Sequence, residues 1–295
     1  MISADEGGGS GRDWVDYLTE RERARLRETE EWITRPQGLV GRAMAMVGKP
    51  LDFAYSRVPE AVKDRISESI LSVLTGVRTT SQASVSQRGI LDRLSAAVGF
   101  EVIDLPSIHR LDVDAVDRLA GECLRFNKTA GFVEGGAAGA AGLMGLAVDI
   151  PALYLLVFRT VQEISLCYGF PIDSPAEVAH ILKVVDVGHY LESESKRRGM
   201  IEIESIQSMI RQGAPIKDLE RAFVAKGLQA LARHLSTQIT RRKLAQTVAI
   251  VGSVIGASVN YQLVADVGET AFHAYRRRFL VEVAYLRMAA QVTDV

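Results

Sequence analysis

The chain has 295 residues, enough for one large domain or two small ones with a substantial core. Thirty-five Lys and Arg balance 36 Asp and Glu, and the net charge of −1 argues against binding nucleic acid through overall positive charge. With 47% hydrophobic and 24% charged residues the chain is not globally disordered, and eight prolines and 25 glycines exclude a collagen-like protein.

The two cysteines, Cys123 and Cys167, lie far apart in the sequence, each in an apolar stretch. We interpret both as buried thiols of a reducing compartment, and their spacing excludes a disulfide scaffold or a CxxC metal site. Residues 1–12 are acidic and rich in Gly and Ser, without the basic start and apolar run of a secretory signal. We therefore expect a disordered tail over residues 1–12 and a cytoplasmic location.

A charged helix is predicted over residues 13–36, with Asp13 as its N-cap and Pro36 as its stop. Nine of the twelve positions between Thr19 and Trp32 are Glu or Arg, and many of them can pair at i,i+3 or i,i+4. Such a run is typical of a helix face in water, and a helix that binds a partner is the alternative. The remaining residues, 37–295, are expected to form a single helical domain.

Several amphipathic helices are predicted between residues 41 and 124. In the strongest pattern, apolar residues between Val62 and Val77 recur at spacings of three and four, which places them on one helix face. A connector that contains Pro106 separates two further helices. The predicted helices cover residues 41–55, interrupted at Pro50, 59–77, 87–98 and 111–124, with the connector at 99–110.

A glycine-rich segment follows. Six of the fifteen residues from Gly131 to Gly145 are glycine, and Gly131, Gly135 and Gly139 are spaced four apart. Glycine at every fourth position flattens one face of a helix, so that a neighbouring backbone can approach closely. Because each glycine costs about 0.8–1 kcal/mol of helix propensity, this segment needs a compensating contact. Together with the apolar stretch 152–170 it predicts a helical hairpin.

The next part of the chain alternates between apolar and polar helices. Ser174 and Glu177 fit a capping box, in which each side chain satisfies a free backbone N–H of the other, at the start of a helix over residues 175–188. Residues 189–213 are polar and are expected to form a surface helix or loop. An amphipathic helix is predicted over residues 215–233.

A second apolar segment, Leu244–Ala265, has 22 residues without a formal charge and ends at Asp266, after which a polar helix follows. Strand signals are sparse apart from the β-branched run Val248–Ile255, whose length favours a helix. The sequence therefore predicts an all-α protein, a multi-helix bundle around the Gly/Ala-rich hairpin and this second glycine-containing helix. The predicted helix-packing glycines are Gly131, Gly135, Gly139, Gly252 and Gly256.

Neither apolar segment is a simple membrane span. Leu244–Ala265 is long enough but carries several polar residues, and the uncharged stretch Gly135–Val148 has only 14 residues before Asp149. A central Asp would cost roughly 2.5–3.5 kcal/mol on insertion. Three environments would supply the contacts that compensate for the helix propensity lost at the glycines: a soluble core, a membrane-inserted or re-entrant hairpin, or a cleft for a lipid or other ligand. Basic residues nearby would suit anionic headgroups, with solvated helix ends as the alternative; they are Arg241, Arg242, Lys243, Arg276, Arg277 and Arg278.

A group of polar residues is expected inside the bundle. Arg159 and Glu163 can form an ion pair at i,i+4 in an otherwise apolar helix, and buried polar groups need partners from facing helices. His273 follows Glu269 by one helical turn, but the other histidines lack ligand spacing, so no metal site is predicted. The candidate polar cluster comprises Arg159, Gln162, Glu163, Asn260, Asp266 and His273.

Two distant blocks of this sequence resemble the EcsC protein family. The resemblance covers roughly residues 40–285 and leaves the charged N-terminal helix outside the pattern or at its variable edge. It implies a bacterial protein of undefined biochemistry, whose namesake accompanies the two components of an ABC transporter, and it implies no catalytic residues. The matching residues are Glu134-Gly-Gly, Asp149-Ile-Pro, Gln162-Glu163-Ile, Tyr168-Gly-Phe-Pro, the block from Val251 to Tyr261, Asp266-Val-Gly, His273 and Arg276.

The leading prediction is a non-enzymatic, membrane-associated helical protein at the inner face of the cytoplasmic membrane, accessory to a membrane transport or envelope process. Its partners would be a lipid surface and a protein of that process, with no nucleic acid, and no particular cofactor is indicated. The HExxH, GxSxG and GxGxxG motifs are absent. Two alternatives are a membrane-inserting, pore-forming effector and a soluble enzyme or ligand-binding protein with a polar or metal site among Arg159, Glu163, Asp266 and His273.

Overall fold

The structure is a computed structural model that describes residues 13–35, 48–76, 85–138, 142–190, 192–213, 227–245 and 259–293. Within these ranges every regular element is a helix, which confirms the predicted all-α bundle. The predicted tail, 1–12, lies outside the described residues. In chain order the elements are a short 3-10 helix η1 (Asp13–Tyr17), α1 (Glu20–Thr34), α3 (Gly48–Ser56), α4 (Glu60–Gly76), α5 (Gln87–Val98), α6 (Leu105–Ile108), α7 (Val113–Ala138), α8 (Gly142–Cys167), α9 (Pro175–Gly188), α10 (Ser193–Arg211), α12 (Gly227–Ala245) and α14 (Val259–Thr293).

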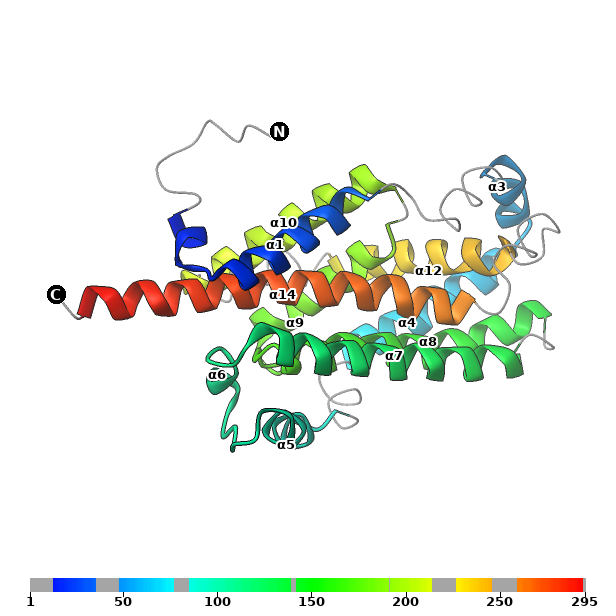
Figure 1. Ribbon diagram of the computed structural model, residues 1–295. Coiled ribbons are helices and arrows are strands. Elements are labelled where there is room, and N and C mark those ends of the chain that lie inside the picture. Colours follow the sequence, from blue (N-terminus) through cyan, green and yellow to red (C-terminus); the bar gives the residue numbers. More distant parts are fainter. Residues whose placement is uncertain are drawn as a thin grey trace.

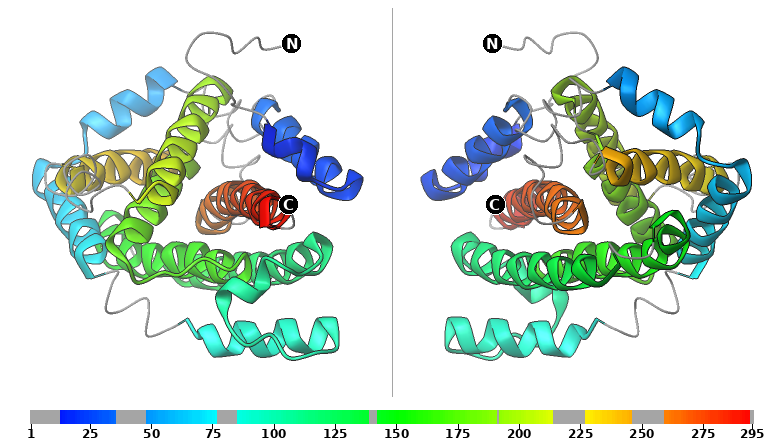
Figure 2. Two further views of the ribbon diagram at one scale, coloured as in Figure 1. Left: turned by 90° about the vertical axis from the view of Figure 1, so that its left-hand side faces the viewer. Right: turned by 90° about the vertical axis from the view of Figure 1, so that its right-hand side faces the viewer.

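The long helix α14 lies at the centre of the bundle (Figure 2). Its 35 residues extend about 50 Å at 1.5 Å per residue, and α1, α7, α8, α9 and α10 pack around it. Between Leu263 and Ala284 side chains are buried on most faces, which is the pattern of a core helix. The helix continues through Asp266, where the sequence analysis placed the end of an apolar run. On the other side of α8, the helices α4 and α12 pack against each other.

The first long helix begins later than predicted. Asp13 starts the turn η1, and the N-cap of α1 is Thr19. Thr19 Oγ1 accepts a hydrogen bond from Glu22 N at 3.3 Å, and Glu22 Oε2 accepts one from Thr19 N at 2.8 Å. This reciprocal pair satisfies backbone donors on both sides of the helix start, so the prediction of Asp13 as the cap was wrong.

The predicted start of α9 is half correct. Ser174 is the N-cap, and its Oγ accepts a hydrogen bond from Glu177 N at 3.2 Å. The carboxylate of Glu177 does not complete the box, because it accepts two hydrogen bonds from the guanidinium of Arg278 in α14. The predicted connector at 99–110 also contains a short helix, α6, which Asp104 caps.

Two glycines are required by close packing. A Cβ at Gly188, the last residue of α9, would lie 2.6 Å from Val267 Cα, so the backbones of α9 and α14 touch at this point. Gly169, two residues after the end of α8, has a φ of +83°, and a Cβ there would also lie 2.8 Å from Leu105 O. Only glycine fits both positions without moving a neighbouring backbone.

Helix α8 runs through Pro151 and is apolar over most of its length. Its part from Ile150 to Cys167 is long and apolar enough to cross a membrane, but 72% of that part is buried inside the bundle. The core helix of a soluble protein can have the same length and composition, so α8 is weak evidence for a membrane span.

Candidate functional site

Four described helix termini that border the two glycine-rich segments lie toward the same end of the bundle, at the right of Figure 1. Near this end α7 stops and α8 starts, and residues 246–258 connect the end of α12 to the start of α14. We call this the glycine-rich end. The described helix termini that define it are Ala138, Gly142, Ala245 and Val259.

Gly131 lies against the first turns of α14 near this end. A Cβ at Gly131 would be 3.2 Å from Val264 Cγ2 and 3.4 Å from the carbonyl oxygen of Asn260, so α7 and α14 approach closely here. This contact joins the beginning of the first glycine-rich segment to the end of the second. Among the other predicted packing glycines, Gly135 belongs to α7, while Gly139, Gly252 and Gly256 lie outside the described residues.

Three pairs of an aromatic ring and a cation belong to α3 or the residue after it, α4, α7 and α14, and α3 packs against α12. Phe53 of α3 is 62% exposed, and the guanidinium of Arg57 lies 4.7 Å from its ring centroid. Tyr261, in the first turn of α14, is 38% exposed, and Lys128 Nζ lies 5.3 Å from its ring. Such pairs suit the boundary between lipid tails and headgroups. With a third pair at 4.7 Å, the aromatic–cationic rim consists of Phe53, Arg57, Tyr55, Lys63, Tyr261 and Lys128.

Arg276, predicted to contact lipid headgroups, is instead buried in an ion-pair network. It is 5% exposed, and its guanidinium lies 2.8 Å from Asp117 and 3.1 Å from Glu28. Tyr168 donates a hydrogen bond to the same Asp117 at 2.6 Å. Burial raises the pKa of Asp117, and the nearby Arg276 guanidinium opposes that rise. The network joins α1, α7, α8 and α14, so Arg276 is structural.

Arg278 and Arg242 are likewise committed inside the fold. Arg278 donates two hydrogen bonds of 2.6 Å to Glu177, and Arg242, 3% exposed, donates one of 2.8 Å to Asp266. A buried charge needs such a partner, which corrects the prediction that these two arginines face lipid headgroups. The other basic residues of that prediction are more exposed: Arg241, paired with Asp52, Arg277, paired with Glu204, and Lys243.

The predicted polar cluster is divided among three places. On α8, Arg159 Nε and Glu163 Oε1 form the expected pair at 3.0 Å, and Glu163 Oε2 accepts a hydrogen bond from Asn127 of α7 at 2.7 Å. Gln162 is fully buried, and its amide has no hydrogen-bond partner among the described residues.

The α14 members of the predicted cluster bind elsewhere. Asp266 accepts hydrogen bonds from Arg242 and from Gln262, while Asn260 backs onto Gly131. His273 lies two turns further along α14 and contacts α1. These interactions belong to three places in the bundle rather than to one site.

His273 takes part in a stack that the sequence analysis missed. Trp32 of α1 contacts two basic side chains. The His273 ring stacks on it with ring centroids 4.3 Å apart, and Nζ of Lys196 in α10 lies 3.1 Å from the Trp32 ring centroid. Burial lowers the pKa of His273 to about 2 and that of Lys196 to about 8. His273 is therefore neutral, with Nδ1 3.2 Å from Thr29 Oγ1. The stack holds α1 against α10 and α14.

Another histidine, His189, is held neutral in the core. Its Nδ1–H donates to Val185 O at 2.7 Å, and its Nε2 accepts from the Tyr154 hydroxyl at 2.8 Å. Burial, followed by the charge of Arg242, lowers the pKa of His189 to about 3. Within the described ranges no three His, Cys, Asp or Glu residues lie close enough together to hold a metal ion.

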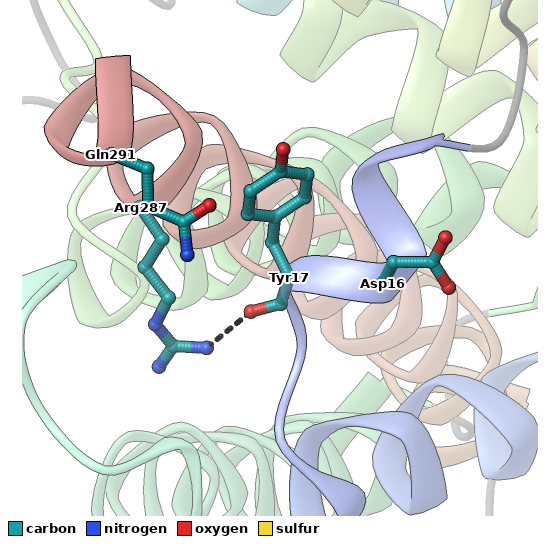
Figure 3. A pocket seen from close by; sticks show the side chains of 4 residues that line it. All are labelled: Asp16, Tyr17, Arg287 and Gln291. Carbon is teal, nitrogen blue, oxygen red and sulfur yellow. Dashed lines mark hydrogen bonds between the residues drawn. The ribbon is translucent and has the colours of Figure 1, made fainter. Parts of the chain in front are cut away.

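A polar pocket of about 590 Å³ opens at the opposite end of the bundle, between η1 and the last turns of α14 (Figure 3). Arg287 donates to Tyr17 O at 2.9 Å and makes two hydrogen bonds to the carboxylate of Glu22. Because its charge is already neutralised inside the protein, Arg287 is a poor anchor for an anionic ligand. The lining residues are Asp16, Tyr17, Arg287 and Gln291.

Comparison with protein families matches residues 23–280 to the EcsC protein family. The chain belongs to the EcsC protein family. Two relatives from Bacillus subtilis (strain 168) are similar to it: the uncharacterized protein YdbA is 25% identical over 87% of this chain and 92% of its own, and protein EcsC is 23% identical over 77% and 86%. No solved structure matches the chain.

The EcsC family match begins within α1, at residue 23, so of the two predicted positions for this helix, outside the pattern or at its edge, the second is correct. In the structure α1 is attached to the rest of the bundle by ion pairs. Arg25 of α1 lies 2.7 Å from Asp114 of α7, and Glu22 pairs with Arg287 of α14. Some of the Glu and Arg residues of α1 thus form ion pairs with other helices of the bundle, so the charged face of α1 does not face only water.

Proposed function

We propose that this EcsC-family protein acts as a membrane-associated helical protein without a reaction of its own, seating its glycine-rich end on the inner face of the cytoplasmic membrane. One observation carries the proposal: α7 ends and α8 starts within the uncharged stretch Gly135–Val148, toward the same end of the bundle as the end of α12 and the start of α14, which lie within the uncharged stretch Leu244–Ala265 (Figure 1). Charged residues make up 24% of the whole chain. An end supplied with uncharged segments is therefore the part best suited to leave water.

The aromatic–cationic rim favours insertion to the depth of the headgroups. Lys128, 20% exposed, already lies 3.7 Å from Glu269, so it is a poor anchor for a phosphate. Phe53 and Tyr261 could enter the boundary of the acyl chains, while Arg57 stays beside Phe53 and reaches lipid phosphates. Each such cation contributes about 1 kcal/mol of attraction near an anionic surface. The burial of α8 within the bundle fits this shallow arrangement better than a membrane span by that helix.

Vesicle flotation tests the proposal with a matched pair of variants. We expect the full-length protein to float with anionic phospholipid vesicles and Phe53→Glu to bind about tenfold more weakly or worse, since burying a Phe side chain contributes roughly 1.5–3 kcal/mol. Phe100→Glu is the control, because Phe100 is 60% exposed but lies between α5 and α6, away from the rim. Equal losses in both variants, or no flotation of the unaltered protein, would refute the proposal.

Tryptophan fluorescence tests the insertion depth. The native tryptophans, Trp14 and Trp32, lie in η1 and α1, whereas a Ser253→Trp variant labels the second glycine-rich segment. We expect vesicles of brominated lipid to quench the emission of Ser253→Trp beyond that of the unaltered protein. If the two emissions are quenched equally, the second glycine-rich segment does not enter the lipid.

We further propose, from the EcsC resemblance, a protein partner in a membrane transport or envelope process. A photo-crosslinking residue at Phe53 should capture that partner from membranes, whereas one at Phe100 should not. Leakage of vesicle contents on binding would instead favour the pore-forming alternative.

A further inference from the structure

The two cysteines, distant in the sequence, meet in the core. Cys123 belongs to α7 and Cys167 is the last residue of α8, and their Sγ atoms lie 3.9 Å apart. Both thiols are free, and the residues are 2% and 0% exposed. A rotation of the side chains that shortens this distance would bring the sulfurs to bonding distance between two helices already packed together.

An arginine from a third helix touches one of the two sulfurs. Arg93 of α5 places Nη1 3.3 Å from Cys123 Sγ and Nη2 3.3 Å from Glu122. The hydrogen bond from Cys167 and then the charge of Arg93 lower the pKa of Cys123, while Glu163 and burial act against them. Burial raises the pKa of Cys167. The pair is therefore unequal, with Cys123 the better thiolate and Cys167 the neutral neighbour.

The position of α5 provides a route to Cys123. This helix lies outside the layer formed by α7 and α8, at the bottom of Figure 2. The side chain of Arg93 is 47% exposed, so the guanidinium that touches the buried sulfur also reaches solvent. Outward motion of α5 would expose Cys123 to a small reagent without unfolding the α7–α8 pair.

We propose that Cys123 and Cys167 are a redox-active dithiol, which a small hydroperoxide such as hydrogen peroxide oxidises to a disulfide between α7 and α8. The Cys123 thiolate attacks one peroxide oxygen and breaks the O–O bond, and the released hydroxide takes a proton to become water. The resulting sulfenic acid is attacked by Cys167 sulfur, which loses its proton as the sulfenic hydroxyl leaves as a second water. Two thiols and one peroxide thus yield one disulfide and two waters, with two electrons passing from sulfur to oxygen.

A reversible disulfide of this kind suits a protein of a reducing compartment, where disulfides that do form serve transient or sensing roles. It would tie together the two helices that lead to the glycine-rich end. The chemistry rests on the two sulfurs and Arg93 and does not depend on membrane association, so its test is separate from that of the proposed function.

The test exposes the full-length protein to hydrogen peroxide, counts thiols after denaturation and maps disulfides by peptide mass spectrometry. We expect both thiols to disappear together into an intramolecular Cys123–Cys167 link that dithiothreitol reverses. In Cys167→Ser, dimedone should trap a sulfenic acid on Cys123, while Cys123→Ser should leave Cys167 unreactive. Persistence of both thiols at peroxide doses that oxidise free cysteine, or links only between molecules, would overturn the proposal.

The role of Arg93 is tested by rate. Arg93→Met should slow oxidation about tenfold by lowering the thiolate fraction, and Arg93→Lys should keep most of the rate. Arg88→Met is the control, because Arg88 is 77% exposed on the same helix and pairs with Asp92. An oxidation rate that rises in Arg93→Met, or falls equally in Arg88→Met, would refute stabilisation of the thiolate by Arg93. Circular dichroism spectra verify that the variants remain folded.

Discussion

Neutralising Asp117 tests how the central helix is held in place. The side chains of Asp117 and Arg276 are 11% and 6% exposed. Arg276 lies 2.8 Å from one carboxylate oxygen and donates to the other at 3.1 Å, where the Tyr168 hydroxyl also donates. Asp117→Asn keeps the shape but removes the charge, so the buried guanidinium retains Glu28 as its nearest carboxylate.

The expected loss of stability follows from this geometry. Removing one partner of a buried ion pair costs about 3–5 kcal/mol, and we expect a value near the lower limit because Glu28, 45% exposed, still neutralises part of the charge. The control applies the same substitution to an exposed pair. Asp92→Asn, whose partner Arg88 is 77% exposed, should cost less than about 1 kcal/mol.

Urea unfolding followed by far-UV circular dichroism measures both free energies of unfolding. We also expect the double variant Asp117→Asn, Arg276→Met to lose less stability than the sum of its two single variants. Each single variant leaves one charge of the Asp117–Arg276 pair without the other, whereas the double variant removes both charges of the pair. If Asp117→Asn costs no more than Asp92→Asn, or if the two single losses simply add, the network does not hold α14 in the way inferred here.

Three further predictions concern packing and charge. Gly188→Ala should lower the free energy of unfolding by about 1–3 kcal/mol, because its Cβ would collide with Val267 Cα. Gly121→Ala, whose Cβ would make only an ordinary contact of 3.5 Å with the Arg125 side chain, should raise it by up to about 1 kcal/mol in the same urea titration. His189 binds a proton below pH 6.5 when unfolded but only near pH 3 when folded, so it should contribute a loss of stability of about 1.4 kcal/mol per pH unit as the pH drops between these values. His273 adds a slope of its own, so His189→Gln should reduce the total slope by the share of one histidine; an unchanged slope would contradict the prediction. Lys196 has a lowered pKa, so its folded form sheds a proton near pH 8 and stability should rise from there towards pH 10; in Lys196→Met this rise should be absent from thermal melts.

The local structure of this protein could be predicted from its sequence where short-range chemistry decides. Helices α5 and α9 begin at Ser86 and Ser174, serines whose side chains cap the first turn, and α9 ends at the predicted residue. The expected ion pair between Arg159 and Glu163 also forms, because residues four apart on a helix are always neighbours. The two blocks that resemble the EcsC family led to the correct family.

Predictions from the sequence were wrong where a charged or aromatic side chain contacts a helix that is distant in the sequence instead of facing water. A charged residue on a helix has the same sequence pattern whether it faces solvent or a carboxylate. The sequence therefore predicts surface positions for Arg242, Arg276 and Arg278, whereas in the structure each pairs with a carboxylate of another helix. Likewise, no spacing rule connects His273 to Trp32.

Taken alone, then, the amino-acid order determined that the chain is helical, where several helices begin, and that two uncharged stretches are rich in glycine. Only the packing of the helices brought the ends of α7 and α12 and the starts of α8 and α14 toward one end of the bundle, placed Cys123 beside Cys167, and paired Arg242, Arg276 and Arg278 with carboxylates of other helices. Helical periodicity specifies which face of a helix is apolar, but it contains no information about which other helix that face will meet. Burial of charge and contact between distant residues arise from that choice of neighbours.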